Sequence, residues 1–350
     1  MDHRNGTREP AVTETASTNP RDLPAADYQS VAMLPSLGII RVTGPEAGSF
    51  LTAQFTNDVG ALPESRSQLG AWCNAQGRVL VVFRLLRHEA AYVLVLPQEM
   101  IGSTLERLKK FVLRARLTLE EASEELRVLG SFGAQTLAGV AAHLPPIPEQ
   151  ENTVAHRAGV SVIRVPGVLP RWLIIGTNEF LAALRAKVPA ADVPDTAWRL
   201  QDILAGIPMV DAATTEAFLP QMLNLDALGG LSFTKGCYPG QEVIARLQYR
   251  GQLKRRMYLA LVEDAAAPRA GDRVYSRALL GSQPAGQIVS AAPRDSRCFA
   301  LLAVVDNDSA HTGSIHLQDP DGPPLVFQPL PYPIDETGDL SSRLTSPQGQ

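Results

Sequence analysis

The pattern of apolar residues changes along the chain, and this change indicates two units. Between residues 38 and 208, apolar runs typical of strands alternate with amphipathic segments typical of helices. From Met257 onward the apolar runs are short and are separated by Gly, Pro and Asp, which is typical of a small β-barrel. The sequence therefore predicts an α+β fold, with one unit over residues 28–250 and a C-terminal β-barrel over residues 251–334.

Hydrophobic periodicity places the individual elements of the first unit. Apolar runs predict strands at residues 38–44, 78–88, 91–97, 160–166 and 171–176. Helical spacing of apolar residues predicts helices at residues 45–55 and 98–116. Thr177 and Asp195 are expected to cap two further helices, and Gly206 with Pro208 is expected to end the second of them.

The ends of the chain and its bulk properties exclude several classes of protein. Residues 1–27 and 335–350 are polar, so we expect both tails to be disordered. We expect no membrane association, since no apolar run reaches the roughly 18 residues that cross a membrane, and no secretory signal is visible. The three cysteines lie far apart, which predicts no disulfide framework, no autonomous metal site and a reducing, cytoplasmic setting. The net charge of −4 means that any RNA contact would depend on a local basic patch.

The stretch LSFTKGCYPGQEVIAR, residues 231–246, differs from ordinary scaffold. If residues 241–248 form a helix, Cys237 precedes its N-terminus, where the helix dipole and Lys235 would together stabilise a thiolate. Alternatively, the YPGQ segment forms a type II turn, which would leave Cys237 exposed and less activated. A third interpretation is a buried cysteine with only a packing role.

A basic group follows the cysteine. On a helix, Glu242 and Arg246 would be spaced so that they could form an ion pair. The group could bind the carboxylates of a ligand or the phosphates of RNA, or it could simply face solvent. Its members are Arg246, Arg250, Lys254, Arg255 and Arg256.

These segments resemble the YgfZ family of folate-binding proteins, which is related to the T-protein of the glycine cleavage system. The family motif, Lys-Gly-Cys-aromatic-x-Gly-Gln-Glu, stands here as residues 235–242 and is followed by Arg246 and the Lys254-Arg255 pair. The segments FLPQMLNLDALGGLSF (218–233), AQFTNDV (53–59) and AWCNAQGRVL (71–80) also match the family pattern.

The resemblance implies a ring of three lobes, in which residues 28–250 form two interleaved lobes around a central pocket for tetrahydrofolate or a derivative. It further implies a role in the assembly or repair of iron–sulfur clusters and, through this role, in tRNA modification. The implied partners are a reduced folate and iron–sulfur assembly or client proteins, with tRNA as a further candidate.

The family motif also assigns candidate roles to individual residues. Cys237 would be a reactive thiol and a transient iron ligand, and Lys235 would support its thiolate form. For Gln241, Gln221 and Asn224, a hydrogen bond that stabilises a loop is an equal alternative to ligand binding. The candidate folate-binding residues are Tyr238, Gln241, Glu242, Arg246, Gln221, Asn224, Asn57 and Arg199.

One departure from the T-protein pattern affects the expected activity. T-proteins carry acidic residues on the strand after their Gly-Gly turn, whereas the strand after Gly77 reads VLVVF here. Valine cannot hold or move charge at a reacting folate nitrogen, so the aminomethyl transfer of T-proteins is not expected. The alternative to a binding role is a folate-dependent one-carbon transferase that acts on another substrate, and the sequence leaves open whether there is turnover.

Overall fold

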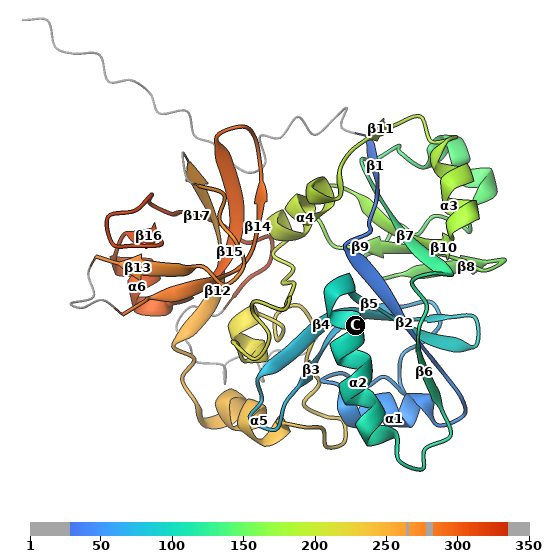
Figure 1. The fold of residues 1–350 in the computed structure, drawn as a ribbon, viewed down its shortest axis with the longest axis horizontal. Coiled ribbons are helices and arrows are strands. Elements are labelled where there is room, and N and C mark those ends of the chain that lie inside the picture. Colours follow the sequence, from blue (N-terminus) through green and yellow to red (C-terminus); the bar gives the residue numbers. More distant parts are fainter. Residues whose placement is uncertain (1–28, 264–265, 278–282, 335–350) are drawn as a thin grey trace, which may run out of the picture.

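Three β-sheets form the frame of the protein in the computed structural model, which describes residues 29–263, 266–277 and 283–334 (Figure 1). The tails that we expected to be disordered, residues 1–27 and 335–350, lie outside the described residues. Among the described residues, all strand pairs are antiparallel except the parallel pair of β1 (Ser30–Met33) and β11 (Ala191–Asp192). None of the helices in the described part of the chain is long and apolar enough to cross a membrane.

The first sheet has five strands and carries its helices on one face. In sheet order the strands are β3 (Ser67–Cys73), β4 (Val79–His88), β5 (Ala91–Pro97), β2 (Leu37–Thr43) and β6 (Thr118–Glu121). The helices are α1 (Ala47–Gln54), η2 (Gln98–Met100) and α2 (Ile101–Val112). The helix expected over residues 98–116 is therefore confirmed, but it ends four residues earlier.

The second sheet has six strands, in the order β11, β1, β7, β10, β9 and β8. Its longer strands are β7 (Leu126–Phe132), β9 (Val160–Val165) and β10 (Arg171–Thr177), beside the short β8 (Val154–Arg157). Along the chain, η3 (Ala138–His143) lies between β7 and β8, α3 (Asn178–Arg185) lies between β10 and β11, and α4 (Asp195–Leu204) follows β11.

Two helix caps were predicted here, and one of them is wrong. The backbone N–H of Phe180 donates to Thr177 Oγ1 at 3.2 Å, so Thr177 caps α3 as expected. Asp195, in contrast, is the first residue of α4, and Pro194 occupies the cap position. The Asp195 carboxylate instead accepts a hydrogen bond from the backbone N–H of Ser36 at 2.9 Å. It therefore ties α4 to the turn between β1 and β2.

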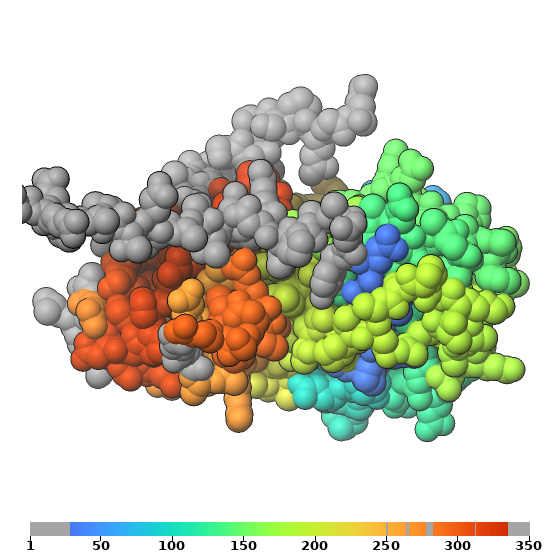
Figure 2. Space-filling view, turned by 90° about the horizontal axis from the view of Figure 1, so that it is seen from above, coloured from blue at the N-terminus to red at the C-terminus, as the bar shows by residue number. Residues whose placement is uncertain are grey.

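The third sheet belongs to the C-terminal part of the chain, orange to red in Figure 2, which lies beside the blue-to-green part that contains the other two sheets. In sheet order its strands are β16 (Ile315–Leu317), β13 (Arg273–Ser276), β14 (Gly286–Pro293), β15 (Cys298–Asp306), β12 (Arg255–Glu263) and β17 (Val326–Gln328). Within the described residues no strand pairing joins β16 to β17; only an isolated bridge links His316 to Pro324. The expected β-barrel is therefore a curled half-barrel, with the short helix α6 (Asn307–Thr312) after β15.

A segment with little regular structure joins the sheets and shares one core with them. It contains η4 (Pro220–Leu223) and ends in α5 (Gln241–Arg250). Leu223 and Leu225 of this segment are fully buried in the same cluster as Val82 of β4, Ile203 of α4 and Leu302 of β15. Burial of this many large apolar side chains fixes the sheets relative to one another.

Candidate functional site

The loop that carries Cys237 combines both structures that its sequence allowed. Gly240 has φ +79° and ψ −1°, the values of the third position of a type II turn, and the Gln241 N–H donates to the Tyr238 carbonyl at 3.2 Å. Helix α5 begins directly after this turn, at Gln241. The thiol of Cys237 is free and exposed, so the interpretation as a buried packing residue is wrong.

Gly240 is held in this conformation by the turn between β3 and β4. A Cβ atom at Gly240 would lie 2.5 Å from the carbonyl oxygen of Asn74 and 2.6 Å from Cα of Gly77. Only glycine fits a positive φ with backbone this close. The Cys237 loop is thereby fixed against the first sheet.

Lys235 is half-buried and lies beside the cysteine. Its ammonium donates to the Thr52 carbonyl near the end of α1 and sits 4.5 Å from the ring centroid of Tyr238. Burial lowers the pKa of Lys235 to about 8, while the charges of Asp58 and Cys237 act in the opposite direction. The ammonium group is therefore placed where it can stabilise a negative charge on the Cys237 sulfur.

Tyr238 is largely occupied by contacts within the protein. It is 6% exposed, its ring lies under Lys235, and its hydroxyl meets no hydrogen-bond partner among the described residues. Burial raises the pKa of this hydroxyl, and the neighbouring buried thiol of Cys73 adds to the effect. The side chain thus connects the Cys237 loop to the core of the first sheet.

The polar residues at the start of α5 face outward. Glu242 and Arg246 are both exposed, Gln241 is half-buried, and no ion pair between Glu242 and Arg246 occurs among the described residues. Of the remaining basic group, Lys254 and Arg255 are exposed. The side chain of Arg250, another predicted member, lies outside the described part of the structure.

Gln221 and Asn224 are fully buried, and their amides hold backbone. The Gln221 amide donates to the Ile244 carbonyl of α5 at 2.8 Å, and the Asn224 amide donates to the Met257 carbonyl of β12 at 2.8 Å. These contacts favour the loop-stabilising alternative for both residues. Only Gln221 Oε1 is left without a partner among the described residues.

Asn57 holds backbone, and Arg199 lies on another element. Asn57 is 5% exposed, and its amide donates to the carbonyls of Leu69 and Gly229. Arg199 lies half-buried on α4. Because Leu69 also lines a cavity between the first and second sheets, the inter-sheet cavity, Asn57 supports a wall of this cavity.

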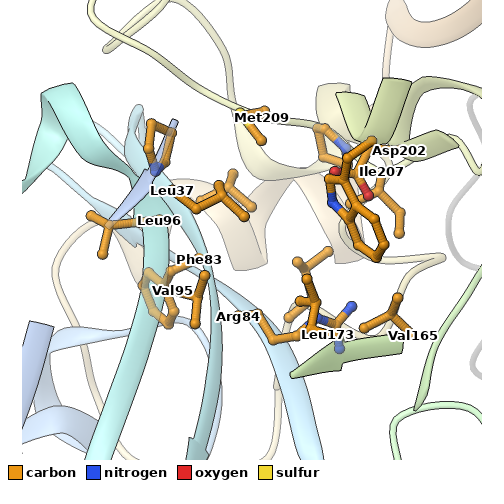
Figure 3. A pocket seen from close by; sticks show the side chains of 15 residues that line it. Leu37, Phe83, Arg84, Val95, Leu96, Val165, Leu173, Asp202, Ile207 and Met209 are labelled. Carbon is orange, nitrogen blue, oxygen red and sulfur yellow. The ribbon is translucent and has the colours of Figure 1, made fainter. Parts of the chain in front are cut away.

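That cavity lies where the first sheet, the second sheet and α4 meet (Figure 3). Its enclosed space is ≈ 60 Å³, and it reaches ≈ 500 Å³ only when the open space at its mouth is counted. None of the site residues predicted from sequence lines it. Its lining combines apolar side chains with two aromatic rings, an arginine and a carboxylate, among them Phe83, Arg84, Val165, Trp198, Asp202 and Met209.

Buried charge distinguishes this cavity from a packing defect. Asp202 forms a 2.7 Å ion pair with the fully buried Arg171, whose guanidinium lies 4.9 Å from the Trp198 ring. Burial raises the pKa of Asp202, although Arg171 opposes the shift. The cavity thus contains an acceptor that is held in place by a neighbouring cation.

Arg84 adds a second buried cation to the cavity, and the hydrogen-bond partners of its guanidinium are neutral. Its guanidinium donates to Ser67 Oγ at 3.0 Å and to Asn152 Oδ1 at 2.7 Å, and it forms no ion pair among the described residues. Burial, aided by Arg171, lowers the pKa of Arg84 to about 10, while the charges of Asp202 and Glu151 act in the opposite direction. A buried cation whose hydrogen-bond partners are neutral is costly, which is characteristic of a site for an anionic or electron-rich ligand.

Comparison of this arrangement with known structures identifies the fold as that of the glycine-cleavage T-protein. The aminomethyltransferase T of Bartonella henselae superposes with a TM-score of 0.69 over 89% of this chain and 88% of that protein, at 16% sequence identity. No protein-family model matches the chain.

Curated relatives narrow the assignment. The tRNA-modifying protein YgfZ of Colwellia psychrerythraea is 34% identical over 276 residues, covering 79% of this chain and 85% of the relative. The tRNA-modifying protein YgfZ of Pectobacterium atrosepticum is 31% identical over 321 residues, covering 90% of this chain and 96% of the relative. The chain belongs to the YgfZ family.

Proposed function

We propose that this protein binds a reduced folate in the inter-sheet cavity and supports the assembly or repair of iron–sulfur clusters, and through them tRNA modification, with Cys237 as its reactive thiol. The observation that carries the proposal is the cavity itself, with Arg84 and the Arg171-bound Asp202 buried in its lining. The names of the YgfZ relatives, which are described as tRNA-modifying, support the same role.

The chemistry of the cavity suits a pterin. A pterin is flat and presents paired N–H donors next to carbonyl and ring-nitrogen acceptors. Asp202 can accept from such donors, Arg84 can donate to the acceptors or to a carboxylate, and Trp198 offers an aromatic face. When bound, a reduced folate would supply a carrier for one-carbon units.

The thiol site lies on another face of the same core. Cys237 is exposed beside Lys235, so it can exchange with thiols or ligate an iron atom transiently during cluster transfer. No group of three or more His, Cys, Asp or Glu side chains that could hold a metal occurs in the described part of the chain. The iron would therefore be cargo in passage, and a reducing, cytoplasmic setting suits a free thiol of this kind.

Calorimetric titration with tetrahydrofolate separates the two parts of the proposal. Wild type and Cys237→Ala should bind with the same affinity, because Cys237 does not line the cavity, whereas Asp202→Asn should bind at least tenfold more weakly. Thermal unfolding of Asp202→Asn controls for loss of fold. Absence of saturable binding to wild type would overturn the folate assignment.

The role of the thiol is tested in cells. In a strain without its own YgfZ, wild type should restore the level of thiolated tRNA nucleosides measured by mass spectrometry, and Cys237→Ser should not. Full restoration by Cys237→Ser would remove the thiol from the proposal while leaving folate binding intact.

One observation favours the alternative of a one-carbon transferase. The strand after Gly77 lacks an acid, but α4 brings the Asp202 carboxylate into the cavity from another part of the chain. Purified protein mixed with methylene-tetrahydrofolate and candidate amines should then form a new product. The binding role predicts no turnover in this assay.

A further inference from the structure

The C-terminal end of α2 and the turn after it form an exposed basic tip. We propose that this tip binds single-stranded RNA. The proposed function needs no direct RNA contact by this chain, so the inference goes beyond it. The tip consists of Lys109, Lys110, Phe111, Leu113, Arg114 and Arg116.

The positive charge of the tip is local, because the chain as a whole carries a net charge of −4. Lys109 and Arg114 are exposed and form no ion pair among the described residues. Lys110 pairs with Glu106 at 3.1 Å and Arg116 with Glu46 at 3.0 Å, both at the surface. Exposed pairs of this kind contribute little to stability, so phosphates can replace their carboxylates at small cost.

Helix stabilisation accounts for only part of this charge. Lysines in the last turn of α2 compensate the helix dipole. Arg114 and Arg116 lie beyond the last residue of α2, Val112, where the dipole gives them no such role. Arg116 is accounted for by its ion pair with Glu46, so Arg114, which forms no ion pair among the described residues, is the cation that needs a second reason.

The apolar residues of the tip are exposed at a cost to the folded protein. Leu113 is 88% exposed and has φ +43°, a left-handed conformation that a leucine rarely adopts. Phe111 is 48% exposed, with its ring edge-on to Trp72 at 6.2 Å between centroids. An exposed ring among cations is the arrangement on which unpaired bases stack while their phosphates are bound.

A hollow is lined by Trp72, whose ring the Phe111 ring contacts edge-on. Glu99, Ser103, Thr104 and Arg107 also line it, and it encloses ≈ 610 Å³ including the space at its mouth. Trp72 is 2% exposed, and its indole N–H meets no acceptor among the described residues. A base carbonyl or ring nitrogen is an acceptor that would satisfy this buried donor.

A membrane surface fits these observations less well. The apolar face of α2 is used internally, since Ile101, Leu105 and Leu108 are buried against the first sheet. Only two apolar side chains of the tip are exposed, and an interfacial helix needs a whole apolar face to enter lipid. The phosphates of RNA need only the cations and the aromatic ring.

Fluorescence anisotropy with a labelled 20-nucleotide single-stranded RNA tests the proposal on the full chain over a series of KCl concentrations. Lys109→Ala/Arg114→Ala should weaken binding at least tenfold and reduce the slope of log K against log salt by about 1.4, about 0.7 for each lost phosphate contact. The matched control is Lys187→Ala/Arg273→Ala, which removes the same charge, one lysine and one arginine, from exposed positions outside the tip. The control should bind as wild type does.

A second readout reports on the aromatic ring. RNA should quench the fluorescence of Trp72 in wild type and in Phe111→Tyr, and the quenching should be lost in Phe111→Ala. Three results would overturn the proposal. They are no salt-dependent binding of RNA by wild type, an equal loss of RNA affinity in the control variant, or binding of wild type to phosphatidylglycerol vesicles but not to RNA. Folate titration of the same variants is expected to be unchanged, so failure here leaves the proposed function standing.

Discussion

Asp226 accepts hydrogen bonds from the guanidinium of Arg256 with both carboxylate oxygens, at 2.8 and 3.0 Å. The side chain of Asp226 is 4% exposed and that of Arg256 is 0% exposed. The same guanidinium donates to the Gln221 carbonyl at 3.1 Å and to Asn224 Oδ1 at 3.3 Å. This pair therefore joins the segment before the Cys237 loop to the first strand of the third sheet. Arg256 cannot serve as a phosphate ligand, in contrast to the sequence-based expectation for the basic group.

Removing one partner of this pair should destabilise the fold strongly. Arg256→Met leaves the Asp226 carboxylate buried without its cation, which costs about 3–5 kcal/mol. Arg255→Met, an exposed neighbour on the same strand, should change the free energy of unfolding by less than about 0.5 kcal/mol. Urea denaturation of the two variants measures both effects, and equal stability of the two would contradict the assigned role of Arg256.

Local pattern was enough to predict most elements, and it left three alternatives open for the Cys237 loop, two of which the structure combines. The apolar runs of β4 and β5 are rich in valine, which is typical of buried strands, and the α2 residues Leu105 and Leu108 repeat at helical spacing, so neighbours along the chain determine these structures. The Tyr-Pro-Gly-Gln segment specifies its turn through Gly240, which needs a positive φ. These predictions depend on few residues that are close in sequence.

The inter-sheet cavity could not be predicted from local pattern. Arg84, Arg171 and Asp202 come from β4, β10 and α4, and only the packing of the sheets brings them together. The single local signal was the presence of a charged residue in an otherwise apolar run, as for Arg84 in VVFRLL. The buried roles of Gln221 and Asn224 also depend on partners, Ile244 and Met257, that sequence spacing does not reveal.

Gly240→Ala should damage the Cys237 loop and the fold together. The added methyl group would meet the Asn74 carbonyl at 2.5 Å, and alanine at φ +79° is strained, which together cost about 1–3 kcal/mol or more. Gly236→Ala, where a Cβ meets no atom within 4 Å, is the matched control and should have little effect. Thermal unfolding distinguishes the two, and an unperturbed Gly240→Ala would show that the turn can relax.

Leu108→Ala tests the packing of α2 on the first sheet. Leu108 is fully buried, so its truncation leaves a cavity and should lower the free energy of unfolding by about 2–5 kcal/mol. Lys109→Ala, the exposed residue that follows it, should stay within about 0.5 kcal/mol of wild type. Chemical denaturation gives both values, and similar losses in the two variants would argue against this packing.

The three cysteines should differ in reactivity toward iodoacetamide. Cys237 is exposed, whereas Cys73 and Cys298 are buried and burial raises the pKa of both of these thiols. Mass mapping of native protein after limited alkylation should therefore find the label at Cys237, with all three residues modified only after unfolding. Cys237→Ser should unfold at the wild-type temperature, and a loss of several degrees would mean that the thiol contributes to packing.

Lys235 should make stability depend on pH in the alkaline range. Its pKa falls from 10.5 to about 8 on folding, because the charged form is partly desolvated. Between these values the unfolded chain binds more protons than the folded one, so the contribution of Lys235 to stability rises from about pH 8 to pH 10.5. The quantity to measure is the free energy of unfolding of wild type minus that of Lys235→Met, by urea titration at several pH values. A difference that stays flat or falls over this range would mean that the ammonium is not desolvated. The structural basis proposed for its influence on Cys237 would then be lost.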